Sequence, residues 1–254
     1  MNRRSFFKFL GIGAATAVVA PKMLAVESTG LSGTPVNKKP FIPNPIYVQH
    51  TPEEFGFIEG LTIFEEPREG YDYSIGVEPG DGLGGSPSVV SVMRVGKGDE
   101  PCEQVAEFVS GKHNPAQLVP IVAKISRKYR GKCIDPRGPM IVIEQVMAPG
   151  DVIQQQLKII GFTRFFKVSG NTKDKHGKSV AWNKEGWYSN SWSVPMLMGR
   201  FVEAIEHGWY EPKSKVLCSV LFKPNKTVYQ HPHVRAAAQS YTGYYAFDED
   251  NRNG

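Results

Sequence analysis

Short apolar runs separated by glycine- and proline-rich turns dominate the chain between residues 73 and 109. Residues 73–77 form an apolar run that ends at Glu78, and residues 88–95 alternate between apolar and polar positions. Between these two runs lies a glycine-rich turn, and residues 103–109 form a third run. Runs of this length that are bounded by turn residues are typical of strands. The pattern therefore predicts three consecutive strands joined as a meander.

A helical period follows the predicted meander. Asn114 and Pro115 are typical of a helix start, and the next apolar residues recur at the spacing of one helix face. The elements predicted from here on are a helix at 114–129, a strand at 140–143, a helix at 149–161, a strand at 162–168, a polar loop at 169–187 and a helix at 193–208. This order predicts an α/β fold, an RNase H-like mixed sheet flanked by helices.

The first 25 residues have the layout of a targeting segment. Arg3 and Arg4, with a Phe two positions later, resemble the twin-arginine export signal, and an apolar stretch of small residues follows. The stretch is too short for a comfortable membrane span. A basic amphipathic helix that is never exported is the alternative interpretation.

Composition divides the remainder of the chain into two parts. Residues 26–56 are rich in Ser, Thr, Gly, Pro and Asn without helical or strand periodicity, which predicts a linker. Residues 57–254 carry the periodic elements and form the predicted folded domain.

Charge and cysteine content narrow the functional classes only slightly. The formal net charge of +5 favours polyanionic partners such as DNA, although a basic protein without such a partner has the same charge. The chain has three widely spaced cysteines and no Cys-x-x-Cys pair. A structural zinc site of the usual spacing and a disulfide framework are therefore not expected.

Two glutamates follow predicted strands directly, Glu78 after residues 73–77 and Glu144 after residues 140–143. If the two strands are neighbours, both carboxylates emerge at the same edge of the sheet. Carboxylates are suited to Mg²⁺ or Mn²⁺, and two ions held together stabilise the attacking and leaving oxygens of phosphodiester cleavage. The alternative is that both are solvent-facing residues at strand ends.

The same segments resemble the nuclease domain of phage terminase large subunits over residues 57–222. The matching segments, each weak alone, keep the family's order and spacing: 61–80, 82–92, 103–107, 114–118, 141–144, 150 and 156–157, 174–179, 186–190, and 195–197. The chain has no P-loop sequence, so the ATPase motor that precedes this domain in the family is not expected here.

The resemblance implies a metal-dependent endonuclease that cuts concatemeric double-stranded DNA during genome packaging, in the host cytoplasm. Glu78 and Glu144 become the catalytic metal ligands, with two Mg²⁺ or Mn²⁺ ions as cofactors. The family usually has Asp at the first of these positions. The implied partners are DNA, a separate terminase ATPase, the small terminase subunit and the portal.

The family's third acid precedes a final helix, and Asp248 and Asp250 are the candidates for it in this chain. No helical pattern follows them, so the final helix is expected to be absent, and a solvated acidic tail is the alternative interpretation. His231 and His233 are compatible with a metal site or with a structural role. Phosphate contacts, or simple solvation, are expected for four loop lysines: Lys173, Lys175, Lys178 and Lys184.

Two other functions stay open on the sequence. A catalytically decayed DNA-binding or packaging accessory module would explain Glu78 in place of Asp and the uncertain third acid. A periplasmic protein unrelated to DNA, exported by the Tat translocase, would explain the leader.

Overall fold

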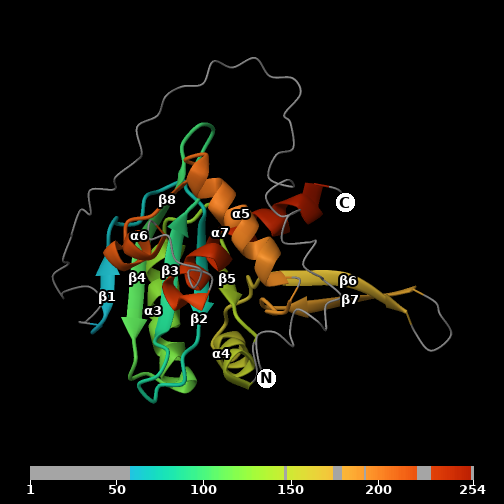
Figure 1. The fold of residues 1–254 in the computed structure, drawn as a ribbon, viewed down its shortest axis with the longest axis horizontal. Coiled ribbons are helices and arrows are strands. Elements are labelled where there is room, and N and C mark those ends of the chain that lie inside the picture. The colour runs from blue at the N-terminus through green and yellow to red at the C-terminus, as the bar shows by residue number, and fades with distance from the viewer. Residues whose placement is uncertain (1–57, 146–147, 174–178, 192, 222–229, 253–254) are drawn as a thin grey trace, which may run out of the picture. The chain divides into compact units, whose positions relative to one another are not determined.

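The computed structural model describes residues 58–145, 148–173, 179–191, 193–221 and 230–252 (Figure 1). All of them belong to one compact unit, Pro43–Gly254. Among these residues no helix has both the length and the apolar character required to cross a bilayer. The leader at 1–25, with Arg3 and Arg4, and the linker at 26–56 lie outside the described residues.

A six-stranded mixed sheet forms the centre of the fold. It contains β1 (Leu61–Ile63), β2 (Tyr73–Glu78), β3 (Ser88–Arg94), β4 (Cys102–Ser110), β5 (Met140–Ile143) and β8 (Tyr210–Glu211). The order is β1-β4-β3-β2-β5, with β8 paired to β4. β2, β3 and β4 are antiparallel neighbours, whereas β5 lies parallel to β2. The predicted meander is confirmed.

Helices cover both faces of this sheet (Figure 1). On one face, α3 (Pro115–Arg130) and α4 (Ala148–Ile159) pack against Ile75, Val77 and their neighbours. On the other face lie α5 (Ser193–Glu206), α6 (Lys215–Leu221) and α7 (Pro232–Arg252). Successive strand residues point to opposite faces, so β5 contributes Ile141 and Ile143 to one core and Met140 and Val142 to the other. The predicted RNase H-like mixed sheet flanked by helices is confirmed.

The start of α3 follows the predicted capping pattern. The Asn114 side chain accepts a hydrogen bond from the Gln117 amide at 3.0 Å, and the Gln117 side chain accepts one from the Asn114 amide at 3.0 Å. Pro115 occupies the first turn, where the missing amide proton costs nothing. These local signals are sufficient to define where the helix begins.

The segment from 162 to 187 differs from its prediction. No strand spans 162–168; Phe165 makes a single parallel bridge with Ile141. The predicted loop at 169–187 instead contains a hairpin of β6 (Lys167–Lys173) and β7 (Ser179–Glu185), which extends away from the main sheet (Figure 1). Both strands carry polar residues at most positions, so no alternation marks a buried face, and the loop prediction was wrong for this reason.

The described chain also contains a long helix, α7, that the sequence pattern did not predict, and Asp248 and Asp250 lie within it. α7 is the longest helix described and packs across β2, β3 and β5. Its backbone comes so close to β2 that a Cβ built on Gly76 would lie 2.0 Å from the Ala236 carbonyl oxygen. A similar restriction holds at Gly243, where a Cβ would lie 2.8 Å from the Val142 side chain. Glycines at both crossing points therefore fix where α7 lies on the sheet.

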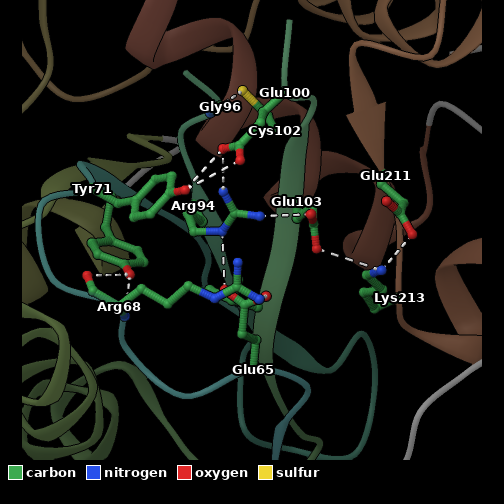
Figure 2. Close-up of polar contacts among 12 residues, drawn as sticks. Glu65, Arg68, Tyr71, Arg94, Gly96, Glu100, Cys102, Glu103, Glu211 and Lys213 are labelled. Carbon is green, nitrogen blue, oxygen red and sulfur yellow. Dashed lines mark hydrogen bonds and ion pairs between the residues drawn. The ribbon is translucent and has the colours of Figure 1, made fainter. Parts of the chain in front are cut away.

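A buried arginine holds the loops around the meander. Arg94 of β3 lies 3.0 Å from a Glu65 oxygen, 3.4 Å from Glu100 and 2.6 Å from Glu103 (Figure 2). The Tyr71 ring lies over the guanidinium at 4.6 Å, a cation–π distance. Lys213 extends the network by pairing with Glu103 and Glu211. Because its charges are mutually paired and its arginine is buried, we assign this network a structural role.

Candidate active site

Glu78 and Glu144 lie at the same edge of the sheet. β2 ends at Glu78, and Glu144 follows β5 directly. The two strands are parallel neighbours with Val77 opposite Ile143, and the Glu144 amide donates to the Val77 carbonyl at 3.0 Å. The predicted placement of both carboxylates at one sheet edge is confirmed. Their catalytic and metal-binding roles stay predictions.

Both carboxylates are withdrawn from solvent. The side chain of Glu144 is 3% exposed and that of Glu78 is 13% exposed. Burial raises the pKa of Glu78 to about 7, although Arg235 and a hydrogen bond from Gln239 act in the opposite direction. The alternative interpretation, solvent-facing glutamates at strand ends, does not fit these exposures.

α7 brings two further side chains, Arg235 and Gln239, onto the acid pair. The Arg235 Nε lies 3.2 Å from Glu78 Oε1, and its Nη2 forms an ion pair with Glu144 Oε1. Gln239 Nε2 donates to Glu78 Oε2 at 2.9 Å and to Glu144 Oε2 at 3.1 Å. All four carboxylate oxygens therefore have a nitrogen of α7 as a partner.

The helix register explains why these two residues share the site. Arg235 and Gln239 are four residues apart, so they lie on one face of α7. Ala236, Ala237 and Ala238 are fully buried, which lets the helix backbone approach the sheet. Ahead of them, His233 Nδ1 lies 2.9 Å from Glu107 Oε1 of β4, and both side chains are buried. This contact holds the first turn of α7, and it assigns His233 a structural role.

The oxygen atoms around Glu78 and Glu144 are suited to a hard divalent cation, but the positive charge of Arg235 disfavours one. Gln239 Oε1 is buried and has no hydrogen-bond partner in the described part of the chain, and it belongs to the amide whose Nε2 contacts both carboxylates. Oxygen ligands of this kind suit Mg²⁺ or Mn²⁺. The Arg235 guanidinium, however, already supplies positive charge between the carboxylates. No group of three or more His, Cys, Asp or Glu side chains suited to a metal occurs among the described residues.

Asp248 and Asp250 belong to α7 itself and do not follow it as a tail. At 1.5 Å per residue they lie about 13 and about 16 Å beyond Gln239 along the helix axis. Their role as metal ligands stays a prediction.

Two of the lysines predicted to contact DNA, Lys173 and Lys184, belong to the β6–β7 hairpin. Lys173 ends β6, and Lys184 is an exposed residue of β7 whose Nζ lies 5.3 Å from the Tyr188 ring centroid. Lys175 and Lys178 lie outside the described residues. The structure thus brings two of the four lysines to one hairpin, and their role stays a prediction.

Sequence reasoning missed Arg235 and Gln239. A signal was present: Pro232 opens the segment, and the apolar positions Val234, Ala238 and Tyr241 recur at helical spacing. Alanine is only weakly hydrophobic, so the three alanines at 236–238 make the buried face of the helix hard to tell from its other faces in the sequence. The crossing of α7 over Gly76 places Arg235 and Gln239 next to the two acids. No local sequence pattern predicts this crossing.

Comparison with known proteins gives a fold likeness. No family model matches the chain, and no curated protein matches its sequence. Among solved structures, the large terminase nuclease of thermophilic phage G20c with bound zinc superposes with a TM-score of 0.50 and 16% identity. The superposition covers 74% of this chain and 90% of that one. The same nuclease with bound magnesium gives a TM-score of 0.50 and 14% identity over 74% and 89% of the two chains. The chain therefore shares its fold with terminase nuclease domains.

Proposed function

We propose that this domain is a terminase-type nuclease that hydrolyses double-stranded DNA during genome packaging. The observation that carries the proposal is the acid pair Glu78–Glu144, buried at the shared edge of two parallel strands. The likeness to a terminase nuclease solved with zinc and with magnesium supports it.

Glu78 and Glu144 would hold a divalent ion, Mg²⁺ or Mn²⁺, and Gln239 would join them through Oε1 once its amide group has turned over. When bound, such an ion supplies charge stabilisation for phosphodiester hydrolysis, and a second ion would extend this to the leaving oxygen. The two carboxylates set the negative charge of the site, and α7 restricts water access to it. On the neighbouring hairpin, exposed Lys184 is suited to a DNA phosphate, which would orient the duplex.

A second candidate, a DNA-binding module that does not cleave, is favoured by one observation. Arg235 lies between the two carboxylates, so positive charge is present there without a metal ion. In that case the domain would bind DNA through sequence-independent phosphate contacts and act as a packaging accessory.

Plasmid cleavage and DNA binding separate the two candidates. The full chain is incubated with supercoiled plasmid and Mn²⁺ or Mg²⁺, beside Glu144→Gln and the control Glu206→Gln, an exposed residue of α5. The nuclease proposal expects cutting by the wild type and the control, with at least about a hundredfold loss in Glu144→Gln. Salt-dependent binding without cutting supports the second candidate. If the protein neither cuts nor binds DNA at low salt, both candidates are wrong.

The proposed function also implies partners and a cellular location. A separate terminase ATPase, a small terminase subunit and a portal would act with this domain in the host cytoplasm. The twin-arginine-like segment at 1–25 is tested by fusing residues 1–30 to a reporter. Export that requires the Tat translocase would support a periplasmic location, and retention in the cytoplasm would remove it.

A further inference from the structure

One positive charge on α7 faces two negative charges on the sheet edge. The Arg235 guanidinium contacts one oxygen of Glu78 and one of Glu144, while Gln239 donates to the other oxygen of each. Arg235 Nη2 also donates to Ser189 Oγ at 2.8 Å. The guanidinium thus takes the position between two carboxylates that a bound cation would take.

The placement of Arg235 is built into the fold, because α7 cannot slide on the sheet. Its backbone lies against Gly76 of β2, its own Gly243 lies against the Val142 side chain of β5, and its first turn is held by the His233–Glu107 contact. If a metal ion replaces Arg235 at the acid pair, the arginine side chain must therefore move while the helix stays in place. That side chain is 21% exposed, and Ser189 offers it a hydrogen-bond partner outside the acid pair.

Two properties decide whether a divalent ion or the Arg235 guanidinium occupies the acid pair: the charge of each cation and the attachment of the guanidinium to the protein. Two ionised carboxylates carry two negative charges, which a divalent ion balances and a single guanidinium balances by half. The guanidinium is attached to the protein, however, and a tethered group has a high effective concentration at its site. A metal ion from solution must displace the guanidinium before it can bind the oxygens of Glu78 and Glu144 that Arg235 contacts.

We infer that Arg235 is a tethered cation that competes with divalent metal ions for the Glu78–Glu144 pair. This inference rests on the metal site of the proposed function. Arg235 fills the pair when metal is absent, and it weakens metal binding by the amount needed to displace its side chain. The same contact keeps two buried carboxylates from facing each other without a counterion.

Metal affinity of the full chain tests the inference without reference to DNA cleavage. Mn²⁺ binding is measured by the electron paramagnetic resonance signal of the free ion for wild type, Arg235→Gln and Arg235→Lys. Arg127→Gln, an exposed residue of α3, is the matched control for loss of one positive charge. We expect Arg235→Gln to bind Mn²⁺ at least about tenfold more tightly than wild type, and Arg127→Gln to match wild type within about twofold.

Thermal unfolding gives a second readout and covers a variant that folds poorly. Arg235→Gln should melt below wild type without metal and recover in Mn²⁺, whereas wild type should change little. Arg235→Lys keeps the charge but cannot contact both carboxylates through a planar fork, so its Mn²⁺ affinity should lie between the other two. Equal affinity in Arg235→Lys and wild type, when Arg235→Gln does not fold, overturns the inference.

The outcome is separable from that of the nuclease proposal. Tighter Mn²⁺ binding by Arg235→Gln that is lost in the double variant with Glu144→Gln supports the inference, even if no variant cuts DNA. If Arg235→Gln binds Mn²⁺ no more tightly than wild type, the inference is wrong, even if the wild type cuts DNA.

Discussion

The two ends of β2 each place an arginine against carboxylates, and the two arrangements differ. Before the strand, Arg164 meets Asp72 through two parallel contacts of 2.7 Å, and its Nε lies 3.2 Å from Asp135. After the strand, Arg235 is shared between Glu78 and Glu144 with one oxygen of each. A bidentate contact satisfies one carboxylate fully, whereas a shared contact leaves each acid partly compensated.

The pKa values of the two acids reflect this difference. Although burial acts to raise it, the pKa of Asp72 is lowered by Arg164 and by a hydrogen bond from Cys133. Asp135 has Arg137 as a further partner, which lowers its pKa to about 2. At the other end, burial raises the pKa of Glu78 to about 7. The first end is a balanced structural ion pair, whereas at the second end burial disfavours the charge of Glu78 and Arg235 compensates it only in part.

Asp72→Asn tests the balanced end and should have the largest effect. The substitution leaves the buried Arg164 guanidinium without its bidentate partner, so the free energy of unfolding should fall by about 3 kcal/mol. Denaturant unfolding measures this, with the exposed Asp99→Asn as control. A loss equal to that of the control would show that the two ends of β2 do not differ in this way.

Gly76→Ala tests the close contact between β2 and α7, the helix that carries Arg235. The added Cβ would lie 2.0 Å from the Ala236 carbonyl oxygen, so α7 must shift, at a cost of about 2 kcal/mol of unfolding free energy. Gly131→Ala is the matched control, since a Cβ there meets nothing within 4 Å and the backbone is helical. If Gly76→Ala is as stable as the control, the close approach of α7 does not set the position of Arg235.

Acid unfolding sharpens the contrast at Asp72. Because the pKa of Asp72 is lowered on folding, its stabilisation is present above the ordinary value of 3.8 and is lost as pH falls through the folded value. Wild type should therefore lose stability below pH 3.8 more steeply than Asp72→Asn. Unfolding free energies measured between pH 5 and pH 2.5 test this, and parallel curves for the two proteins would contradict it.

Glu78→Gln should have the smallest effect on stability. Burial disfavours the charged form of Glu78, and Glu144 keeps Arg235 as its partner, so the neutral amide should change the unfolding free energy by less than about 1 kcal/mol at pH 8. Denaturant unfolding in the absence of metal is the measurement. A loss as large as that of Asp72→Asn would mean that both ends of β2 are structural ion pairs.

The sequence predicts the elements whose signals are local. The meander, α3 with its Asn114 cap and the strand ending at Ile143 follow from apolar runs and turn residues, and Glu78 and Glu144 follow from the strand ends. The β6–β7 hairpin escapes prediction because most positions of its strands are polar and no alternation marks a buried face. Arg235 and Gln239 escape because their role depends on a helix crossing over Gly76, which no local pattern specifies.

The position of α7 in the chain affects the order of folding. Gln239 and Glu78 are 161 residues apart in sequence, and their contact is among the most distant in the fold. Chains fold from the N-terminus during synthesis, and contacts of high sequence separation carry a large loop-closure cost. β2 and β5 are therefore available early, with both carboxylates still hydrated. The acid pair acquires its counterion, and loses its water, when α7 docks on the sheet.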